Sequence, residues 1–319
     1  MRGIGRRVAA WIAVLALAGL AHGAHAADKL RVGKPSAAGF VFALVEIGNA
    51  TGIFARHGLE IETVTLAGGA KLTQAMAARS LDIALGGGTD FAFIAKGAPQ
   101  KGVAAMAGRP LNMGLFVRPG GGIDTVDDVR GRAVGCTTAG SLTMWLGMEL
   151  ARRKGWGEDG IKMIAVGTLE ETAATMKAGN IGAFVANTEG GYRLEAKGEV
   201  KLLLRFDTVV GDFLSNVIFA SNELIAKNPD AVRRFVASWF QIVAFARANK
   251  DETLRLTAPV TRLPPELGAR VYDEQMPMFF ADGHFAKSDV ETVKRSLVEL
   301  GLMNAAPDDA LLFTEEFLP

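Results

Sequence analysis

Small and hydroxyl-bearing residues precede expected helices at three places in this chain, and loops of this kind can hold an anion. The best of them, Thr137-Thr138-Ala139-Gly140-Ser141, carries three hydroxyl groups. Ser36-Ala37-Ala38-Gly39 is its counterpart earlier in the chain, and Gly68-Gly69-Ala70-Lys71 supplies the one lysine of these loops. Because the first amides of a helix lack partners and carry partial positive charge, each loop is suited to a carboxylate, a sulfonate or a similar group.

Two acidic residues argue for a different ligand. Thr89-Asp90 and Thr188-Glu189 each follow an expected strand. A carboxylate at such a place accepts hydrogen bonds from an amine or ring nitrogen and repels a bare anion. Each feature also has a plain structural role, because threonine and serine cap helices and Asp90 can sit in a first turn. We predict a small organic acid as the ligand, with a nitrogen heterocycle as the alternative.

Side chains suited to catalysis are few. Of the four histidines, His22 and His25 fall in an N-terminal segment typical of export signals, which leaves His57 and His284. The chain has no Gly-x-Ser-x-Gly elbow and no Walker loop. This pattern predicts binding without turnover, and with it no cofactor and no metal.

The elements that position these loops occur twice. Val32-Gly33 leads into the first loop and Val134-Gly135 into its counterpart, 102 residues later. The segment from Met76 to Ala84 is repeated in type by Met176 to Phe184, 100 residues later. Each copy consists of a strand, a small-residue loop, a helix and a second strand that ends in threonine and an acid. Two such α/β units predict two lobes that face one cleft.

Hydrophobic periodicity predicts strands alternating with helices, hence a parallel, doubly wound sheet in each lobe. The expected strands are 30–33, 59–66, 82–85, 103–107, 113–117, 133–136, 161–166, 181–186, 201–205 and 217–220. The expected helices are 40–49, 70–79, 90–96, 141–154, 169–178, 229–248 and one that begins at Leu263-Pro264-Pro265. Gly86-Gly87-Gly88 is expected to break the third strand, and Thr89 to cap the helix after it.

The composition break at Arg118-Pro119-Gly120-Gly121-Gly122 is interpreted as the linker between the lobes. We therefore predict an export signal over 1–26, a first lobe over 27–117, a second lobe over 118–215, and a return to the first lobe over 216–319. The strand after Ser215-Asn216 makes the return, and the residues after it are expected to be helical. The two crossings should act as hinges.

The N-terminal segment and the composition predict an exported protein. Arg2, Arg6 and Arg7 precede an apolar run, and Ala24-His25-Ala26 offers a cleavage pattern. Its removal takes three of the 35 basic residues and none of the 34 acidic ones. That balance gives no support to nucleic-acid binding. Cys136 is the one cysteine, so no intramolecular disulfide can form, and its place at a strand end predicts burial.

Several segments resemble periplasmic solute-binding proteins of the nitrate/sulfonate/taurine type, whose ligands also include pyrimidine precursors. The resemblance rests on Gly52-Ile53-Phe54-Ala55-Arg56-His57-Gly58-Leu59-Glu60-Ile61-Glu62, Leu81-Asp82-Ile83-Ala84 and Ala95-Lys96-Gly97-Ala98-Pro99. The run from Asp124 to Gly135 is similar to the entry to their second lobe. Asn180-Ile181-Gly182 departs from the pattern, since relatives often have an acidic residue before that strand.

The resemblance implies a bilobal periplasmic binding protein of type II-like fold, with a ligand cleft between the lobes and a helical C-terminal region. It implies a monomer that receives a small molecule in the periplasm and delivers it to an ABC permease. The residues that we predict to contact the ligand are Ser36, Ala37, Ala38, Gly39, Phe40, Gly69, Lys71, Gly88, Thr89, Asp90, Thr137, Thr138, Gly140, Ser141, Asn187, Thr188, Glu189 and Asn216.

Two other functions compete with transport. Enzymes of the pyrimidine-synthase type look similar in sequence and would use a lysine and a histidine in the cleft. An exported sensor that docks onto a membrane receptor would share the same lobes and cleft.

Overall fold

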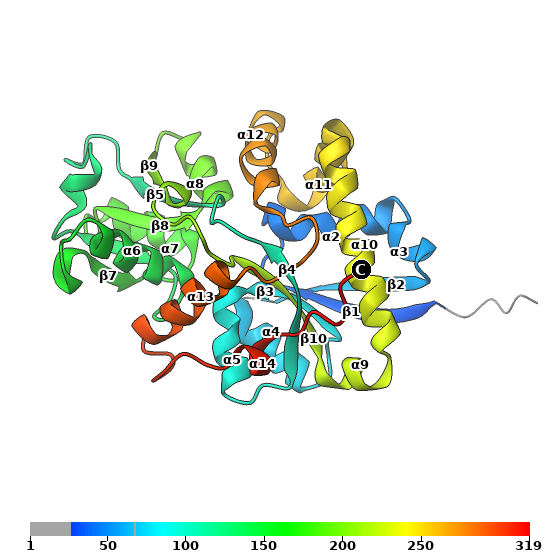
Figure 1. The fold of residues 1–319 in the computed structure, drawn as a ribbon. Coiled ribbons are helices and arrows are strands. Elements are labelled where there is room, and N and C mark those ends of the chain that lie inside the picture. The colour runs from blue at the N-terminus through cyan, green and yellow to red at the C-terminus, as the bar shows by residue number, and fades with distance from the viewer. Residues whose placement is uncertain (1–26, 67) are drawn as a thin grey trace, which may run out of the picture.

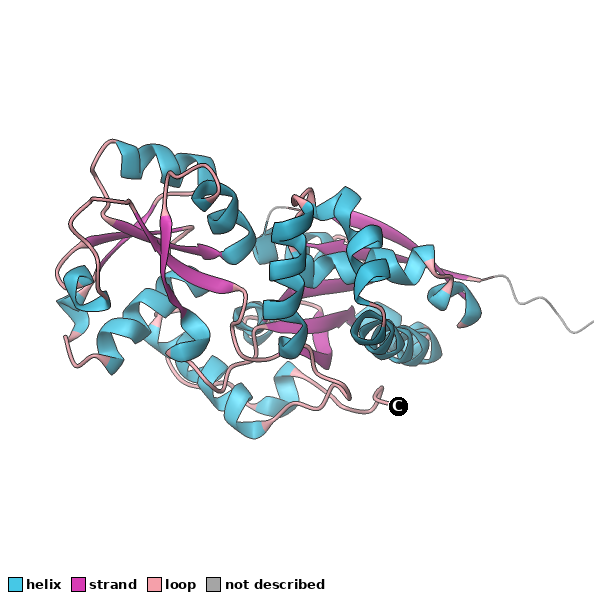
Figure 2. Ribbon diagram, turned by 90° about the horizontal axis from the view of Figure 1, so that it is seen from above, coloured by secondary structure: helices cyan, strands magenta, loops and turns pink. Residues whose placement is uncertain are grey.

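The computed structural model describes residues 27–66 and 68–319, so the predicted export signal lies outside the described residues. The chain forms two lobes, each built on a five-stranded sheet (Figure 1). Helices pack on both sides of the sheets (Figure 2). No helix within the described ranges is long and apolar enough to cross a membrane. The α/β, bilobal fold predicted from the sequence is confirmed.

The first sheet has the strand order β2-β1-β3-β10-β4. Its strands are β1 (Asp28–Lys34), β2 (Leu59–Thr65), β3 (Ile83–Gly87), β4 (Gln100–Ala107) and β10 (Asn216–Ser221). Strand β10 runs antiparallel to both of its neighbours. The sheet is therefore mixed, and the prediction of a wholly parallel sheet is wrong, because the strand that returns from the other lobe enters from the opposite end.

The second sheet repeats this order as β7-β6-β8-β5-β9. Its strands are β5 (Met113–Val117), β6 (Ala133–Cys136), β7 (Lys162–Ala165), β8 (Ala183–Asn187) and β9 (Lys201–Arg205). The duplicated segments also pair in the same register: Val32 lies opposite Ile83 in the first sheet, and Val134 lies opposite Ala183 in the second. The repeat seen in the sequence is thus a repeat of the fold.

The chain crosses between the sheets earlier than predicted. Strand β5 pairs with β8 and β9, so residues 113–117 belong to the second sheet and not to the first. The crossing lies at 108–112, and the glycine-rich segment 118–122 is a turn that follows β5 inside the second lobe. The sequence did not predict the sheet to which this strand belongs, because an apolar strand has the same residue pattern in either sheet. The return to the first sheet at β10 agrees with the prediction.

The glycine run in the first lobe also differs from the prediction. Strand β3 continues through Gly87, and a short 3-10 turn over Gly88–Asp90 follows before α5. A side chain at Gly88 would overlap the carbonyl oxygen of Leu214, in the returning segment. Gly88 N–H in turn donates to the carbonyl oxygen of Ser215 at 3.1 Å. The glycines therefore do not break the strand early. Gly88 leaves room for the returning segment to pass close to the backbone.

The helices begin and end near the predicted residues wherever a cap marks them. Asn228 caps α10 by accepting from Ala231 N–H at 3.1 Å, and Thr168 forms a capping box with Glu171 at the start of α7. The helices are α2 (Phe40–Ala50), α3 (Ile53–Arg56), α4 (Gly68–Ala77), α5 (Phe91–Ala95), α6 (Leu142–Arg153), α7 (Leu169–Lys177), α8 (Thr188–Glu195), α9 (Asn222–Lys227), α10 (Pro229–Ala248), α11 (Lys250–Thr261), α12 (Pro265–Gln275), α13 (Lys287–Glu299) and α14 (Asp309–Leu312).

Two C-terminal helices join the lobes on either side of the crossings (Figure 1). On α12, Glu274 accepts a hydrogen bond from the Tyr192 hydroxyl of α8 at 2.5 Å. On α13, Glu299 accepts from the indole Nε1 of Trp145 in α6 at 2.7 Å. The C-terminal region predicted as packing material is thus also a bridge between the lobes.

Replacement of Gly191 by alanine should destabilise the protein. Gly191 lies in α8, and a Cβ atom there would overlap the ring of Phe116 in β5. We expect Gly191→Ala to lower the free energy of unfolding by about 1 to 3 kcal/mol, because the helix must move off the sheet. Gly268→Ala in α12 is the matched control, since its nearest neighbour, Leu254 Cδ2, is 3.7 Å away. Thermal unfolding measures both, and an unchanged melting temperature for Gly191→Ala contradicts the packing described here.

Candidate functional site

A cleft of about 320 Å³ lies where the two sheets face each other. It is bounded by the carboxyl ends of β1, β3, β6 and β8 and by the two crossing segments. The residues that line it are Pro35, Ser36, Gly39, Val41, Phe42, Gly68, Gly69, Gly87, Gly88, Thr89, Asp90, Asn112, Met113, Thr137, Ser141, Leu142, Thr143, Asn187, Glu189, Ser215 and Asn216.

The duplicated strand-end loops meet at this cleft. The predicted contact residues that line it are Ser36, Gly39, Gly69, Gly88, Thr89, Asp90, Thr137, Ser141, Asn187, Glu189 and Asn216. Those that do not are Ala37, Ala38, Phe40, Lys71, Thr138, Gly140 and Thr188. Both Asp90 and Glu189 therefore face the cleft, a point on which the sequence was silent.

The residues outside the lining have identifiable surroundings. The Phe40 ring packs edge-on against Tyr272 and Phe279 in the core, and Lys71 is exposed on α4. Thr188 is fully buried, where its hydroxyl accepts from the side-chain amide of Gln275 at 3.1 Å. Gln275 lies on α12, and no local sequence pattern predicted that this helix would lie beside the cleft.

Several lining residues escaped the sequence analysis. Asn112 and Met113 lie at the first crossing between the lobes, which the sequence analysis predicted further along the chain, and Ser215 lies at the return crossing. Phe42 and Thr143 lie one residue or more inside helices whose first turns had been singled out. Asn112 is a polar residue directly before an apolar strand, and this was the one sequence signal that could have identified it as a lining residue.

Glu189 joins the two lobes across the cleft. It lies in the first turn of α8, is 2% exposed, and accepts through Oε1 from Phe40 N–H at 2.9 Å. Phe40 begins α2 of the first lobe, whose N-cap residue Gly39 has no side chain to offer. Glu189 thus caps α2 from the opposite lobe, and its negative charge compensates the helix dipole. Burial raises the pKa of Glu189, although the Phe40 amide opposes this effect.

Asp90 lies at the equivalent place in the first lobe. Its Oδ2 accepts from Gly87 N–H at 3.0 Å, and its carboxylate lies against Gly69 at the start of α4. The cap predicted at Thr89 is not found: among the described residues no side chain caps the start of α5, and Asp90 accepts from an amide before its own turn. Burial raises the pKa of Asp90 to about 6, with the Gly87 hydrogen bond acting in the opposite direction.

The hydroxyl-rich loop before α6 is bonded within itself. Ser141 caps the helix by accepting from Met144 N–H at 3.2 Å, and its hydroxyl lies 2.9 Å from that of Thr143. Thr143 also accepts from Thr137 N–H at 3.0 Å. Thr138 contributes its carbonyl oxygen, which accepts from the Ser141 hydroxyl at 2.7 Å. The donors that made this loop attractive for an anion are thus partly occupied by the loop itself.

Among the described lining residues, four buried polar atoms have no well-formed hydrogen bond, although the Gln275 side-chain amide stabilises the Glu189 carboxylate and opposes the rise in its pKa. The four atoms are Asn112 Oδ1, Glu189 Oε2, Ser215 Oγ and Asn216 Oδ1, and each belongs to a residue less than 8% exposed. The amide of Asn216 is oriented by its Nδ2, which donates to the carbonyl oxygen of Gly86 at 3.3 Å. A buried polar atom without a partner costs about 1 to 3 kcal/mol, and a bound molecule can recover this by supplying the missing bond.

The cleft carries acids and no bases. Among the described residues that line it there is no lysine, arginine or histidine, while Asp90 and Glu189 are both present. Lys34, just before the first loop, is buried and paired with Glu46 at 2.7 Å. Over the same described ranges, no group of three or more histidine, cysteine or acidic residues is placed to hold a metal.

The remaining reactive residues lie outside the cleft. His57 ends α3 and faces the Gln241 side chain at 3.1 Å, and His284 faces Glu315 at 3.1 Å. Cys136 is 2% exposed at the end of β6, and burial raises the pKa of its thiol to about 11. The predicted burial of this cysteine is confirmed.

Comparison with known proteins places the chain in a family. The profile of the family described as NMT1/THI5-like matches residues 40–253. The riboflavin-binding protein RibY of Chloroflexus aurantiacus is 26% identical over 240 residues, which cover 70% of this chain and 66% of RibY. A binding protein of Brucella abortus (strain 2308) is 25% identical over 229 residues, which cover 67% of this chain and 66% of that protein. The alignments thus span just under two thirds of these relatives.

Solved structures show the same fold. The periplasmic aliphatic sulphonate-binding protein SsuA of Escherichia coli superposes with a TM-score of 0.76 at 19% identity. The superposition covers 90% of this chain and 92% of SsuA. At this identity the likeness establishes the bilobal architecture and leaves the ligand open.

The raised pKa of Asp90 predicts a pH-dependent stability that Asp90→Asn removes. A carboxyl group whose pKa is higher in the folded state than in the unfolded state stabilises the fold when it is protonated. This stabilisation is complete below the pKa of the unfolded state and is lost as the pH rises through the folded-state pKa of about 6. The free energy of unfolding of Asp90→Asn, compared with that of wild type, should therefore rise on the order of 1 to 2 kcal/mol between pH 5 and pH 7.5. Denaturant unfolding at the two pH values measures the difference. The same difference between variant and wild type at both pH values would mean that Asp90 is as acidic as an exposed residue.

Proposed function

The chain belongs to the NMT1/THI5-like family and has the fold of periplasmic binding proteins, and from this premise we propose that it is exported, captures a small solute between its lobes and delivers it to an ABC permease. The cleft at the meeting of the duplicated loops supports capture. Export and a periplasmic location are supported by the basic and apolar N-terminal segment in the sequence.

The ligand that fits the cleft presents hydrogen-bond donors and carries no net negative charge. The observation that carries this proposal is the set of unpartnered buried atoms: three are acceptors, and the fourth is a hydroxyl that can accept as well. A sulfonate or carboxylate would add further acceptors beside Asp90 and Glu189, with no basic side chain among the described lining residues to offset the repulsion. We therefore adopt the nitrogen heterocycle that the sequence left as the alternative.

The walls suit such a ring. Val41, Phe42, Met113 and Leu142 line the cleft beside the polar atoms. Apolar walls with a few placed polar groups are typical of sites that bind small organic molecules, because the walls remove apolar area from water while the polar groups fix the orientation. RibY, named for riboflavin, shows that a related chain accommodates a nitrogen heterocycle.

Binding without turnover is also supported by the lining. The competing enzyme would need a lysine and a histidine in the cleft, and both described histidines lie elsewhere. Lys71 is exposed on α4 and Lys34 is paired with Glu46. Incubation of the purified protein with its ligand, followed by mass spectrometry of the products, tests this point, and turnover would favour the enzyme.

Glu189→Gln should weaken ligand binding. The variant keeps an oxygen for Phe40 N–H but replaces the charged Oε2 by an amide, which loses a charge-assisted hydrogen bond of about 1.5 to 3 kcal/mol. We expect the dissociation constant to rise about tenfold or more in calorimetry. Lys71→Ala, outside the lining, is the control and should bind as wild type does. The ligand is identified first by mass spectrometry of copurified material and by a panel of pyrimidines, flavins, sulfonates and carboxylates. Binding confined to the acids would contradict the proposed ligand class.

Ligand binding should also close the lobes, because the polar atoms that await a partner come from both of them. Glu189→Ala removes the cap that joins the lobes and should leave the ligand-free protein more open than wild type. Small-angle scattering measures the radius of gyration with and without ligand. A radius that stays the same at saturation in the wild type, and in the variant, argues against closure.

A further inference from the structure

A hollow of about 370 Å³ lies at the far end of the second lobe, at the edge of the sheet opposite the cleft. The side chains of Arg118, Arg132 and Lys162 line it together with that of Asn180. They come from the end of β5, the start of β6, the start of β7 and the residues before β8. Among the described lining residues there is no aspartate or glutamate.

Two of these three cations lack the partners that surface cations usually have: within the described part of the chain, Arg118 and Lys162 form no ion pair. Arg132 lies beside Asp128, to whose carbonyl oxygen its Nε donates at 3.4 Å. Asp128 does not line the hollow, and its carboxylate also accepts from Thr125 N–H at 2.8 Å. That hydrogen bond lowers the pKa of the Asp128 carboxyl group, and the charge of Arg132 helps to lower it. Neighbouring acids are paired elsewhere, Asp124 with Lys201 and Asp127 with Lys154.

The duplicated fold provides an internal comparison. In the first lobe Asp82 N–H donates to the carbonyl oxygen of Arg31 at 3.0 Å, and in the second lobe Gly182 N–H donates to that of Ala133, also at 3.0 Å. Gly182 therefore occupies the place of Asp82, and Ala133 that of Arg31. This is the segment, Asn180-Ile181-Gly182, where an acid was expected from the family resemblance.

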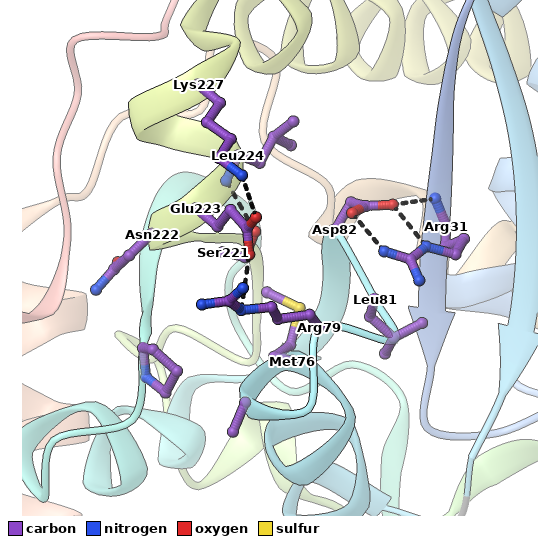
Figure 3. Close-up of a pocket in the computed structure, with 12 residues that line it drawn as sticks. Arg31, Met76, Arg79, Leu81, Asp82, Ser221, Asn222, Glu223, Leu224 and Lys227 are labelled. Atoms are coloured by element: carbon purple, nitrogen blue, oxygen red, sulfur yellow. Dashed lines mark hydrogen bonds and ion pairs between the residues drawn. The ribbon is translucent and has the colours of Figure 1, made fainter.

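In the first lobe the equivalent hollow is neutralised from within (Figure 3). Asp82 there binds Arg31 through two hydrogen bonds of 2.9 and 3.0 Å. Glu223 forms one ion pair with Arg79, at 3.0 Å, and another with Lys227, at 2.6 Å. Each cation that lines the first hollow thus has a carboxylate partner. The second hollow has Ala133 and Gly182 in the places of the Arg31–Asp82 pair, and its cations come from other positions with no acid among its described lining residues.

We propose that this hollow, defined by Arg118, Arg132, Lys162 and Asn180, binds a phosphate-type oxyanion. The anion supplies the negative charge that no described lining residue of this hollow supplies. Guanidinium groups match the oxygen geometry of phosphate, and a lysine adds a point charge. The size of the hollow admits a tetrahedral anion with its water. Because it lies at the opposite edge of the sheet from the cleft, this site is independent of the proposed solute binding.

The anion has two possible sources with the same chemistry: free inorganic phosphate, and the phosphate group of an anionic lipid. Calorimetry with inorganic phosphate in a low-salt buffer tests the first source. Cosedimentation with vesicles of phosphatidylglycerol, against vesicles of phosphatidylcholine alone, tests the second. Saturable binding in either arm supports the site, and the arm that responds identifies the source.

Gly182→Asp is the decisive variant, because it restores the acid that the first lobe has. We expect it to weaken anion binding about tenfold or more, since the new carboxylate competes for the same cations. Gly182→Asn is the matched control and should keep most of the affinity. Both variants place Cβ 2.9 Å from Ile123 Cδ1, a flexible side-chain end, so any cost to folding is shared.

Lys162→Gln, an exposed substitution, should weaken anion binding several-fold while leaving the melting temperature unchanged. Solute affinity in the cleft should be the same in all these variants, so failure of this site and failure of the proposed function are told apart. The proposal is overturned if neither phosphate nor anionic vesicles bind, which would leave solvated surface cations only. It is equally overturned if Gly182→Asp and Lys162→Gln bind as wild type does.

Discussion

The hydrogen bond from Phe40 N–H to Glu189 Oε1, 2.9 Å long and buried, determines how the two lobes of this protein meet. One lobe provides the open end of a helix, and the other provides the carboxylate that caps it. A buried charge without such a partner would cost several kcal/mol, so the two surfaces are held in register. The other oxygen of this carboxylate, Oε2, is buried without a well-formed hydrogen bond, and Glu189 lines the cleft. The contact that joins the lobes is therefore also part of the wall that faces a ligand.

The electrostatic character of the cleft follows from this arrangement. In the first lobe, the start of α2 is occupied by Glu189 and the start of α4 lies against Asp90. Helix ends that are suited to an anion in isolation are thus already supplied with negative charge by the chain. What remains in the lining is a group of buried acceptors without well-formed hydrogen bonds, on which the proposed ligand with N–H donors rests. An anion-binding loop in a sequence is only available if the fold does not bring an internal carboxylate to it.

The two sheets repeat one plan while their ends differ in charge. In each sheet, an antiparallel strand lies beside the third strand of the order: β10 beside β3, and β5 beside β8. Each of these antiparallel strands directly follows a crossing between the lobes. The cleft edges carry Asp90 and Glu189 at equivalent places. At the opposite edges, the first lobe pairs Arg31 with Asp82, whereas the second has Ala133 and Gly182 there, with cations around them. The two lobes thus share backbone hydrogen bonds while their side chains differ.

The sequence by itself determined the lobes, most of the strands and helices, and the loops that would meet at a cleft. These depend on local signals: period-two and helical hydrophobic patterns, caps such as Ser141 and Asn228, and a repeat at a spacing of about a hundred residues. The family resemblance rested on the same local runs. The position of Cys136 at the end of a strand was enough to predict its burial, and the apolar run after Ser215-Asn216 was enough to predict the return of the chain.

Tertiary structure alone decided which sheet β5 joins, that Asn112 and Ser215 line the cleft, and that Glu189 reaches Phe40, 149 residues away in the chain. An apolar strand has the same sequence pattern in either sheet, so its partners are fixed only when both sheets compete for it. Whether a helix end is open to a ligand depends on which distant side chain packs against it, and no local pattern encodes that contact. The ligand class that we propose differs from the acid predicted from the sequence for this reason, because the charge in a cleft is the sum over residues that only the folded chain brings together.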